Sequence, residues 1–237
     1  RYMPNPYFSF KQFTVYHDRC AMKVGTDGVL LGAWADVSSS QKILDVGTGT
    51  GLIALMLAQR CIGARITAID IDGEAILQAR ENMNASPWGS RMETILQDLK
   101  TYQPGKLFDT IVSNPPFFVD SLKCPDHQRN MARHTDTLPA LNLLRKSAEL
   151  LEEDGKLSLI LPAEQTEDLI ALAAGEGLYL SRLTSVITRP GLPPKRSLME
   201  FRKQVSVCEK NNLVVELARH VYTEDYIALT RDFYLKM

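Results

Sequence analysis

The sequence is poor in cysteine, has no excess of charge of either sign and lacks long apolar runs. Its four cysteines are widely spaced and include no CxxC pair, which argues against a zinc knuckle and indicates reduced thiols. No uninterrupted apolar stretch reaches the roughly 18 residues of a membrane span, and no signal peptide is visible. We therefore expect a cytoplasmic protein with no membrane partner.

Two further absences concern ligands. His17, Asp18 and Cys20 are of metal-binding types, but their spacing matches no recurring ligand pattern, so we predict no metal site. The formal net charge is -1 and the pI is near 6.5, so the molecule as a whole does not attract a polyanion. A nucleic-acid partner would have to bind local basic clusters.

The chain has 237 residues, of which 45% are hydrophobic, and is long enough to bury a full core. We predict one α/β domain over residues 1–237, with an N-terminal extension at 1–34 and a C-terminal tail at 208–237 packed on it. The aromatic residues of the tail are expected to fill the core as part of a short helix, rather than to stack on bases.

A glycine-rich loop follows the first buried strand. The apolar run Lys42–Val46 predicts this strand, Gly47–Gly51 (GTGTG) follows directly, and Leu52–Arg60 has the apolar density of a helix. In such an arrangement a nucleotide-like ligand lies over the helix N-terminus, because glycines allow close approach to the backbone. A second strand, Arg65–Ile69, ends at Asp70, which is placed to accept hydrogen bonds from ribose hydroxyls.

A dinucleotide-binding dehydrogenase would share these features, but two residues favour another ligand. The dinucleotide fingerprint requires Gly or Ala at the sixth position of the loop, where this chain has Leu52. Asp45, two residues before the loop, would repel a pyrophosphate but suits a cationic group such as an ammonium. S-adenosylmethionine, with its adenosine, amino acid and sulfonium, fits this loop better than a dinucleotide.

Two later strands are predicted to end at the same edge of the sheet. Met92–Leu96 is followed by Asp98, for which two roles stay open: accepting from the cofactor's adenine amine, or capping a helix. Phe108–Val112 is followed by Asn114-Pro115-Pro116-Phe117. Ligands of such sheets bind beyond the carboxyl ends of the strands, so these side chains should open onto one site.

The Asn-Pro-Pro-Phe segment suits a flat, amine-bearing substrate. Proline after Asn114 favours extended backbone, which lets the Asn114 side chain and the carbonyl oxygens of Asn114 and Pro115 act as acceptors for an exocyclic NH2. Phe117 offers a face for base stacking. A plain loop after a strand is the alternative. Upstream, Lys23–Gly28 is predicted to lead into a helix that Thr26 or Asp27 caps.

The motifs DVGTGTG, AID, QD and NPPF, in this order, resemble those of class I S-adenosylmethionine-dependent methyltransferases that act on planar amines. The segments FKQFTVYHDRCAMKVGTDGVLLGAW and YTEDYIALTRDFYLKM resemble the bacterial tRNA1(Val) adenine-37 N6-methyltransferases, so the similarity covers nearly the whole chain. The resemblance implies a Rossmann-like α/β fold with helices on both faces of a mostly parallel seven-stranded sheet, whose last strand is antiparallel. It also implies S-adenosyl-L-methionine as cofactor and S-adenosyl-L-homocysteine as product.

The resemblance assigns catalysis to Asn114, Pro115, Pro116 and Phe117. Members of the family can have Tyr in place of Phe117, a difference that keeps the ring. The predicted cofactor contacts are Thr26, Asp27, Asp45, Gly47, Gly49, Gly51, Asp70, Ile71, Asp98, Leu99 and Asn114.

Basic residues near the predicted site are candidates for RNA contact. Between Arg189 and Lys203 there are five basic residues against one acidic residue, which predicts a phosphate-contacting arm, with an ordinary solvated hairpin as the alternative. The predicted RNA-binding residues are Lys11, Arg19, Lys23, Arg129, Arg133, Lys195, Arg196 and Lys203.

The leading interpretation is N6-methylation of an adenine in tRNA, with adenine-37 of tRNA1(Val) implied by the resemblance. Methylation of rRNA (adenine N6 or guanine N2) or of a protein glutamine amide are the alternatives. A non-catalytic RNA-binding protein would not explain the glycine loop. We expect no DNA substrate, because no target-recognition insert is present, and no obligate protein partner is evident.

Overall fold

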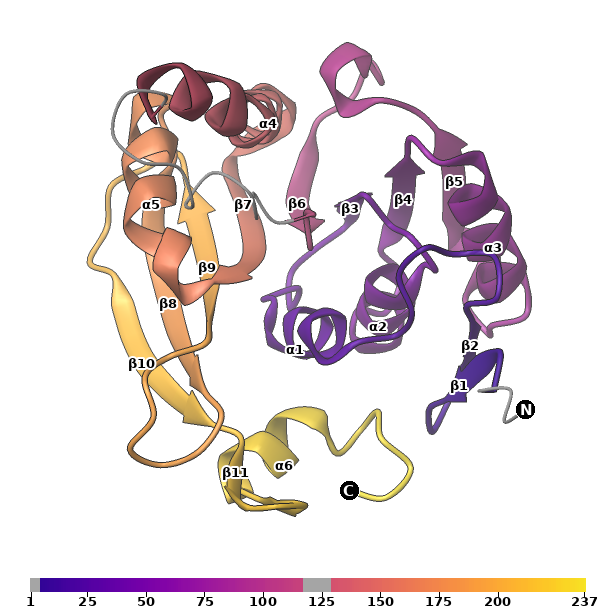
Figure 1. The fold of residues 1–237 in the computed structure, drawn as a ribbon. Helices are drawn as coiled ribbons and strands as arrows, with labels where there is room; N and C mark the ends of the chain where they lie inside the picture. Colours follow the sequence, from indigo (N-terminus) through magenta and orange to yellow (C-terminus); the bar gives the residue numbers. More distant parts are fainter. Residues whose placement is uncertain (1–4, 117–128) are drawn as a thin grey trace.

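The computed structural model describes residues 5–116 and 129–237, and the side chains of all of these except 129–138. Its centre is an eight-stranded sheet with the order β10-β8-β9-β7-β6-β3-β4-β5 (Figure 1). The strands are β3 (Lys42–Val46), β4 (Arg65–Asp70), β5 (Met92–Leu96), β6 (Phe108–Ser113), β7 (Leu151–Pro162), β8 (Tyr179–Ile187), β9 (Arg196–Arg202) and β10 (Glu209–Val214).

The predicted fold class is confirmed, with one difference in strand number. Every neighbouring pair is parallel except those of β9, which runs antiparallel to both β7 and β8. The sheet has eight strands rather than seven, because the first part of the C-terminal tail adds β10 alongside β8. This strand has mostly exposed polar side chains, so its sequence lacks the apolar signal of the other strands.

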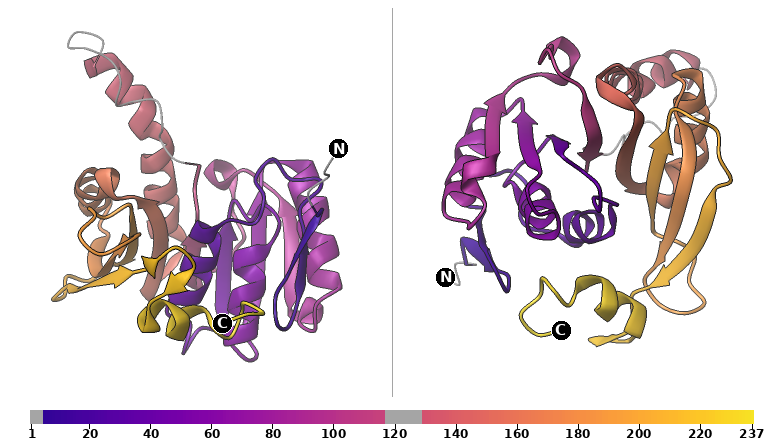
Figure 2. Two further views of the ribbon diagram at one scale, coloured as in Figure 1. Left: turned by 60° about the horizontal axis from the view of Figure 1, so that its bottom comes forward. Right: turned by 180° about the vertical axis from the view of Figure 1, so that it is seen from behind.

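Helices cover both faces of the sheet (Figures 1 and 2). One face packs against α1 (Thr26–Trp34), α2 (Leu52–Arg60) and α3 (Gly73–Asn84), and the other against α4 (Arg129–Leu150) and α5 (Thr166–Gly175). The 3-10 helices are η1 (Gly89–Arg91), η2 (Leu99–Thr101) and η3 (Ala163–Gln165). Among the described residues, none of the helices combines the length and apolar character needed to cross a bilayer.

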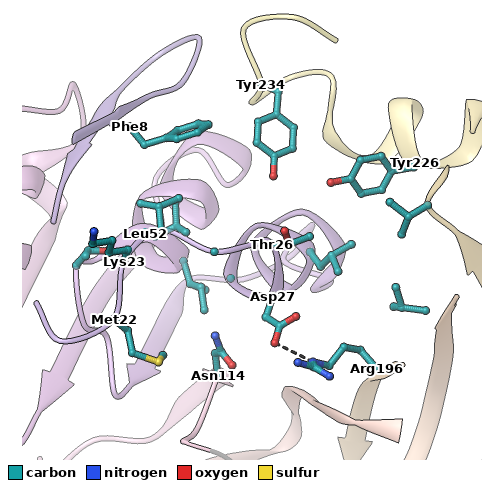
Figure 3. Close-up of a pocket in the computed structure, with 18 of the residues that line it drawn as sticks. Phe8, Met22, Lys23, Thr26, Asp27, Leu52, Asn114, Arg196, Tyr226 and Tyr234 are labelled. Carbon is teal, nitrogen blue, oxygen red and sulfur yellow. Dashed lines mark hydrogen bonds and ion pairs between the residues drawn. The ribbon is translucent and has the colours of Figure 1, made fainter. Parts of the chain in front are cut away.

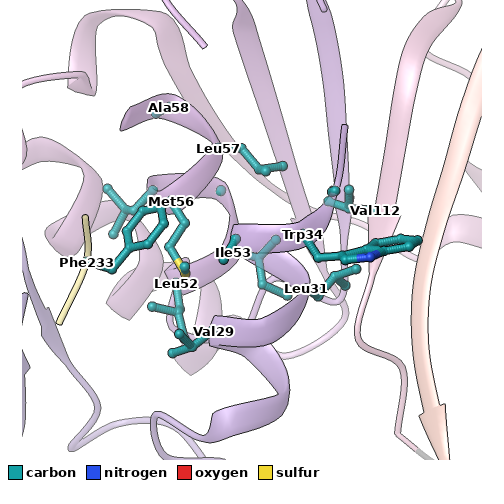
Figure 4. Close-up of a cluster of buried hydrophobic side chains, with 14 of the residues drawn as sticks. Val29, Leu31, Trp34, Leu52, Ile53, Met56, Leu57, Ala58, Val112 and Phe233 are labelled. Carbon is teal, nitrogen blue, oxygen red and sulfur yellow. The ribbon is translucent and has the colours of Figure 1, made fainter. Parts of the chain in front are cut away.

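Successive side chains of the buried strands point to opposite faces of the sheet and so belong to two separate cores. Ile43 and Val112 face α1 and α2, whereas Leu44 and Ile111 face α4 and α5. Side chains of α1 and α2 interlock in the first core, and the tail residue Phe233 packs among them (Figure 4). The predicted core-filling role of tail aromatics therefore holds for Phe233, which is 2% exposed.

The two ends of the chain lie close to each other on the α1–α2 side. The N-terminal hairpin consists of β1 (Tyr7–Ser9) and β2 (Thr14–Tyr16). The C-terminal part contains the short strands β11 (Glu216–Ala218) and β12 (Val221–Tyr222), followed by α6 (Glu224–Thr230). The Lys11 ammonium, from the turn of the hairpin, donates hydrogen bonds to the carbonyls of Arg231 and Met237. The N-terminal hairpin thus holds the last residues of the chain in place.

Candidate active site

The carboxyl ends of β3, β4 and β6 meet at one edge of the sheet. Val46 is in register with Ile69 on one side and with Ser113 on the other. The Ser113 hydroxyl donates to the Val46 carbonyl over 2.9 Å, which fixes the two strand ends together. The glycine loop after β3 and Asn114 after β6 are consequently neighbours.

A cavity of about 1190 Å³ opens at this edge (Figure 3). Its wall is built by the glycine loop, the first turn of α1, the turn between β8 and β9, the N-terminal hairpin and the C-terminal tail. Of the residues predicted from the sequence, those that line it are Lys23, Thr26, Asp27, Gly47, Gly49, Asn114, Lys195 and Arg196.

The glycine loop is held mainly by its own hydrogen bonds. The amides of Gly47 and Thr48 donate to the Ile69 carbonyl over 2.9 and 3.0 Å, and the Gly49 amide donates to Asp70 Oδ2 over 2.9 Å. Gly49 has a φ of +54°, and a Cβ at this position would meet no atom within 4 Å. The loop therefore contributes open space for a ligand more than a row of free amide donors.

Gly51 faces α3 rather than the cavity. It does not line the cavity, and a Cβ here would lie 3.2 Å from Met83 Cε and 3.3 Å from Ala79 Cβ. Its φ of +84° begins α2 while leaving room for α3. Gly51 thus serves the packing of these two helices.

Asp45 lies behind the loop and does not line the cavity. It is fully buried, and its Oδ2 accepts a 2.7 Å hydrogen bond from the hydroxyl of Thr48, which does line the cavity. Burial raises the pKa of Asp45 to about 7; the bond from Thr48 opposes this rise and the charge of Asp70 adds to it. Asp45 is linked to the cavity through Thr48, and its pairing with a cationic ligand group stays a prediction.

The residues predicted to bind the adenosine lie outside the cavity, at the ends of β4 and β5. Asp70 accepts from the amides of Gly49 and Asp72, and a carboxylate retains further lone pairs for a ligand. Ile71 is 75% exposed, and Leu99 is half-buried. Of the two roles left open for Asp98, the structure contains the cap: its Oδ1 accepts from the Lys100 amide at the start of η2.

Asn114 reaches into the cavity (Figure 3). Its side-chain oxygen is buried and has no hydrogen-bond partner among the described residues. A buried acceptor without a donor is costly, so a ligand that supplies one is favoured here. Pro115 is buried and Pro116 exposed, while Phe117 lies outside the described residues.

A pair of residues that the sequence assigned to different ligands is in direct contact. Arg196 Nε lies 2.9 Å from Asp27 Oδ2, and both side chains are about one quarter exposed. Asp27 does not cap α1 as predicted, because the N-cap is Gly25, and no side chain bonds the free amides at this end. The Asp27 carboxylate is instead directed to the first residue of β9.

The residues of the predicted phosphate-contacting arm are spread over the length of β9. Because β9 is antiparallel, Arg196 pairs with Pro162 at the carboxyl edge, whereas Arg202 pairs with Lys156 near the other edge. Six residue steps along a strand separate them by roughly 20 Å. Beyond Arg202, the Lys203 ammonium donates to the carbonyl of Leu151, over 2.7 Å.

The remaining basic candidates divide between the cavity and other surroundings. Lys23 and Lys195 line the cavity together with Arg196. Arg19 pairs with Glu81 at 3.2 Å, and Lys11 holds the C-terminal segment. Arg129 and Arg133 belong to the first turns of α4, but their side chains lie outside the described residues.

Several cavity residues were not predicted from the sequence. Phe8 comes from β1, and Tyr222, Tyr226 and Tyr234 come from the C-terminal tail. Aromatic residues at these spacings predict core packing, which is correct for Tyr226, at 3% exposure, although its ring also borders the cavity. No local pattern signals that the two chain ends meet here.

The residues present fit S-adenosyl-L-methionine, the cofactor expected from the motifs. Open space at Gly47 and Gly49 lies on the same cavity wall as the unpartnered Asn114 oxygen. Gly47 and Gly49 would leave room for the amino acid portion, and Asp70, Ile71, Asp98 and Leu99 lie at the part of the edge where the adenosine is expected.

Comparison with known proteins agrees with this geometry. The family model of the methyltransferase small domain matches residues 22–172. The chain is 60% identical to the tRNA1(Val) (adenine(37)-N6)-methyltransferase of Phocaeicola vulgatus over 99% of this chain and 100% of the relative. It is 45% identical to the protein of the same name from Tolumonas auensis, over 97% of each chain.

Solved structures support the fold. A predicted O-methyltransferase from Agrobacterium tumefaciens superposes with a TM-score of 0.68 at 21% identity, covering 87% of this chain and 96% of that one. A putative RNA methyltransferase from Pyrococcus horikoshii superposes with a TM-score of 0.53 at 19% identity, covering 75% and 81%. The sequence identities over the full length, the matching domain model and the arrangement of the cavity lead to one assignment: this chain belongs to the tRNA1(Val) (adenine(37)-N6)-methyltransferase family.

Proposed function

We propose that this enzyme methylates N6 of adenine-37 in tRNA1(Val). The observation that carries the proposal is Asn114, which lines the same cavity as Gly47 and Gly49 and whose buried side-chain oxygen has no hydrogen-bond partner among the described residues. An exocyclic amine supplies the donor that this acceptor lacks. The names of the relatives, which are 45–60% identical over nearly their full length, support the choice of substrate.

The cofactor in this proposal is S-adenosyl-L-methionine. When bound, it supplies an electrophilic methyl group on a sulfonium and leaves as S-adenosyl-L-homocysteine. The first turn of α1 contributes Thr26 and Asp27 next to the glycine loop, where the amino acid portion is expected. The amides of Gly47 and Gly49 already donate hydrogen bonds to Ile69 and Asp70. The loop is therefore expected to keep its conformation when a ligand binds.

The contribution of the chain to the chemistry is placement of the substrate amine. The lone pair of an adenine amine is delocalised into the ring, which makes the amine a poor nucleophile. Acceptors at Asn114 Oδ1 and the Pro115 carbonyl would draw its two hydrogens out of the ring plane and restore electron density on nitrogen. Alignment of reacting atoms about 3 to 3.5 Å apart can account for a large part of the rate.

No dedicated base is required in this mechanism. The methylated amine is an acidic cation, so its surplus proton passes to a loop oxygen or to water. The target base must first be turned out of the stacked loop, at a cost of a few kcal/mol. The stacking proposed for Phe117, which lies outside the described residues, would offset part of that cost.

The test is methyl transfer from labelled cofactor, followed by mass spectrometry of the products. The substrates are tRNA1(Val), the same transcript with guanine at position 37, total rRNA and a protein substrate with a methylatable glutamine. The proposal expects N6-methyladenosine in the first substrate only. Methylated glutamine, or N2-methylguanosine in rRNA, would contradict it. Cofactor binding without any methyl transfer would favour a non-catalytic RNA-binding protein. We propose tRNA as the partner and the cytoplasm as the location.

A further inference from the structure

The cavity is larger than one small ligand requires. Its volume of about 1190 Å³ exceeds the roughly 300 to 1,000 Å³ of most small-molecule pockets. Figure 3 shows Asn114 and Arg196 at one end and Phe8, Tyr226 and Tyr234 at the opposite end, with Thr26 between them. The reaction proposed above uses the Asn114 end only. We call the opposite end, with Phe8, Tyr226 and Tyr234, the aromatic end; His220, Tyr222 and Lys236 also line the cavity and belong to the same C-terminal segment as the two tyrosines.

The aromatic end is a supported wall with one exposed ring. Tyr234 packs against Phe8, at a centroid distance of 6.1 Å, and against Phe10, at 6.0 Å, and these two rings lie 4.7 Å from each other. Phe10 is buried and anchors both rings, whereas Phe8 itself is 38% exposed. Lys11 also holds the C-terminal tail, because its ammonium donates to the Met237 carbonyl over 3.1 Å. An exposed aromatic ring held in place by buried neighbours is suited to stacking on a planar ligand.

Tyr226 and Tyr234 of this wall carry neutral hydroxyl groups. Burial raises the pKa of Tyr226 and of Tyr234, and the neighbouring Tyr234 further raises that of Tyr226. Figure 3 shows both hydroxyls at the cavity side of their rings. The two hydroxyls interact with each other, and because a tyrosine hydroxyl can both donate and accept, the pair retains hydrogen-bonding capacity for the edge of a base.

The charges around the cavity favour an anion. Both acidic side chains that line it are paired with arginine: Asp27 with Arg196 at 2.9 Å, and Glu216 with Arg189 at 3.4 Å. The cavity is also lined by Lys23, Lys195 and Lys236, none of which has an acidic partner within the described part of the chain. An exposed aromatic ring beside lysines that have no acidic partner among the described residues is typical of surfaces that bind single-stranded nucleic acid.

We propose that the aromatic end binds a second unpaired nucleotide of the RNA loop that carries the target adenine. The base stacks on Phe8, the hydroxyls of Tyr226 and Tyr234 contact its edge, and Lys236 faces a phosphate. This inference rests on the proposed function, since it assigns the remaining part of the same cavity. Stacking tolerates any base, so the subsite adds affinity and register more than sequence preference.

The first test compares Phe8→Leu with the matched control Tyr16→Leu. Both replace an exposed ring of the same hairpin by an apolar side chain, but Tyr16 does not line the cavity. Phe8→Leu should raise the Kd for the anticodon stem-loop about tenfold, equivalent to about 1.4 kcal/mol. Its Kd for S-adenosyl-L-methionine, measured by calorimetry, should stay unchanged. Tyr16→Leu should leave both constants at the wild-type values.

A double-mutant cycle with the RNA identifies the contact directly. Abasic substitution at each loop position in turn should weaken wild-type binding about tenfold at one position other than the target. The same substitution should weaken binding to Phe8→Leu less than threefold, because the stacking partner is already absent. The lysine contacts are tested by Lys236→Gln, which should reduce the salt slope by about one, against the exposed control Lys210→Gln.

The remaining outcomes contradict either the subsite alone or the proposed function as well. If Phe8→Leu weakens cofactor binding instead of RNA binding, the aromatic end belongs to the cofactor and the inference is overturned. Additive losses at every abasic position also overturn it, while methyl transfer by the wild type leaves the proposed function standing. If the wild type neither binds nor methylates RNA, the proposed function and this inference fail together.

Discussion

Asp27 Oδ2 accepts from Arg196 Nε over 2.9 Å, which joins the first turn of α1 to the first residue of β9. Because Asp27 is expected at the cofactor and Arg196 at the RNA, their contact should couple the two ligands. A cycle of Asp27→Ala, Arg196→Ala and the double variant should show a coupling of about 1 kcal/mol in cofactor binding measured by calorimetry. The exposed pair Arg145 and Glu176, also 2.9 Å apart, should show none and serves as the control.

Asn114→Ala should separate binding from turnover. The variant loses the acceptor for the substrate amine but leaves the glycine loop and α1 intact, so cofactor affinity should remain within threefold of wild type. The rate of methyl transfer should fall by about a hundredfold or more, the range found when one polar group is removed from a reacting centre. Turnover within tenfold of the wild type would show that this oxygen does not act on the amine.

Asp45 should make the stability of the protein depend on pH. Its folded-state pKa is raised to about 7, from an ordinary value of 3.8. Between about pH 4 and pH 7 the unfolded chain releases this proton while the folded protein keeps it, so folding becomes less favourable as the pH rises. Relative to Asp45→Asn, the wild type should lose roughly 2 to 4 kcal/mol of unfolding free energy over this range.

Urea unfolding at several pH values measures this effect. Asp154→Asn, at an exposed position, provides the control and should follow the wild-type curve. A constant difference between wild type and Asp45→Asn from pH 4 to pH 7 would mean that Asp45 ionises normally when folded.

Alanine at Gly49 and at Gly51 should produce opposite defects. At Gly51 the new Cβ meets Met83 and Ala79, so Gly51→Ala should have the larger loss in Tm. At Gly49 the Cβ enters open space, so Gly49→Ala should keep more stability but weaken cofactor binding by about tenfold or more. Thermal melts and calorimetry on both variants check the division. Equal losses of cofactor affinity would contradict it.

Lys195 and Lys203 should differ in their effect on RNA binding, although both were predicted as contacts. Lys195 lines the cavity, so Lys195→Gln should lower the salt slope of RNA binding by about one. Lys203 lies beyond the opposite end of β9 and donates to the Leu151 carbonyl, so Lys203→Gln should leave the slope unchanged. A reduced slope for Lys203→Gln would mean that Lys203 contacts the RNA, as the sequence predicted.

Elements with strong local signals could be predicted from the sequence. The apolar run Met92–Leu96 has the bounds of β5, and Leu52–Arg60 those of α2. β10 was missed because Glu209–Val214 is an edge strand with polar, exposed side chains, and its pairing with β8 is set by the tertiary structure.

The residues of the candidate site likewise differ in whether local sequence predicts their position. Asn114 and Gly49 follow buried strands directly, so local sequence places them at one edge of the sheet. The depth of Asp45 and the packing role of Gly51 depend on neighbours from other elements, as does the contact between Phe8 and Tyr234, which join opposite ends of the chain. No short window of sequence contains this information.

The reversed direction of β9 makes one part of the cavity wall replaceable. β8 runs towards the carboxyl edge and β9 runs back from it. The turn that connects them therefore lies at the cavity, which Thr188 and Lys195 line. Its length and composition can vary while the ladder of β9 stays paired on both flanks. Changes in this turn should therefore alter RNA binding while the sheet stays intact.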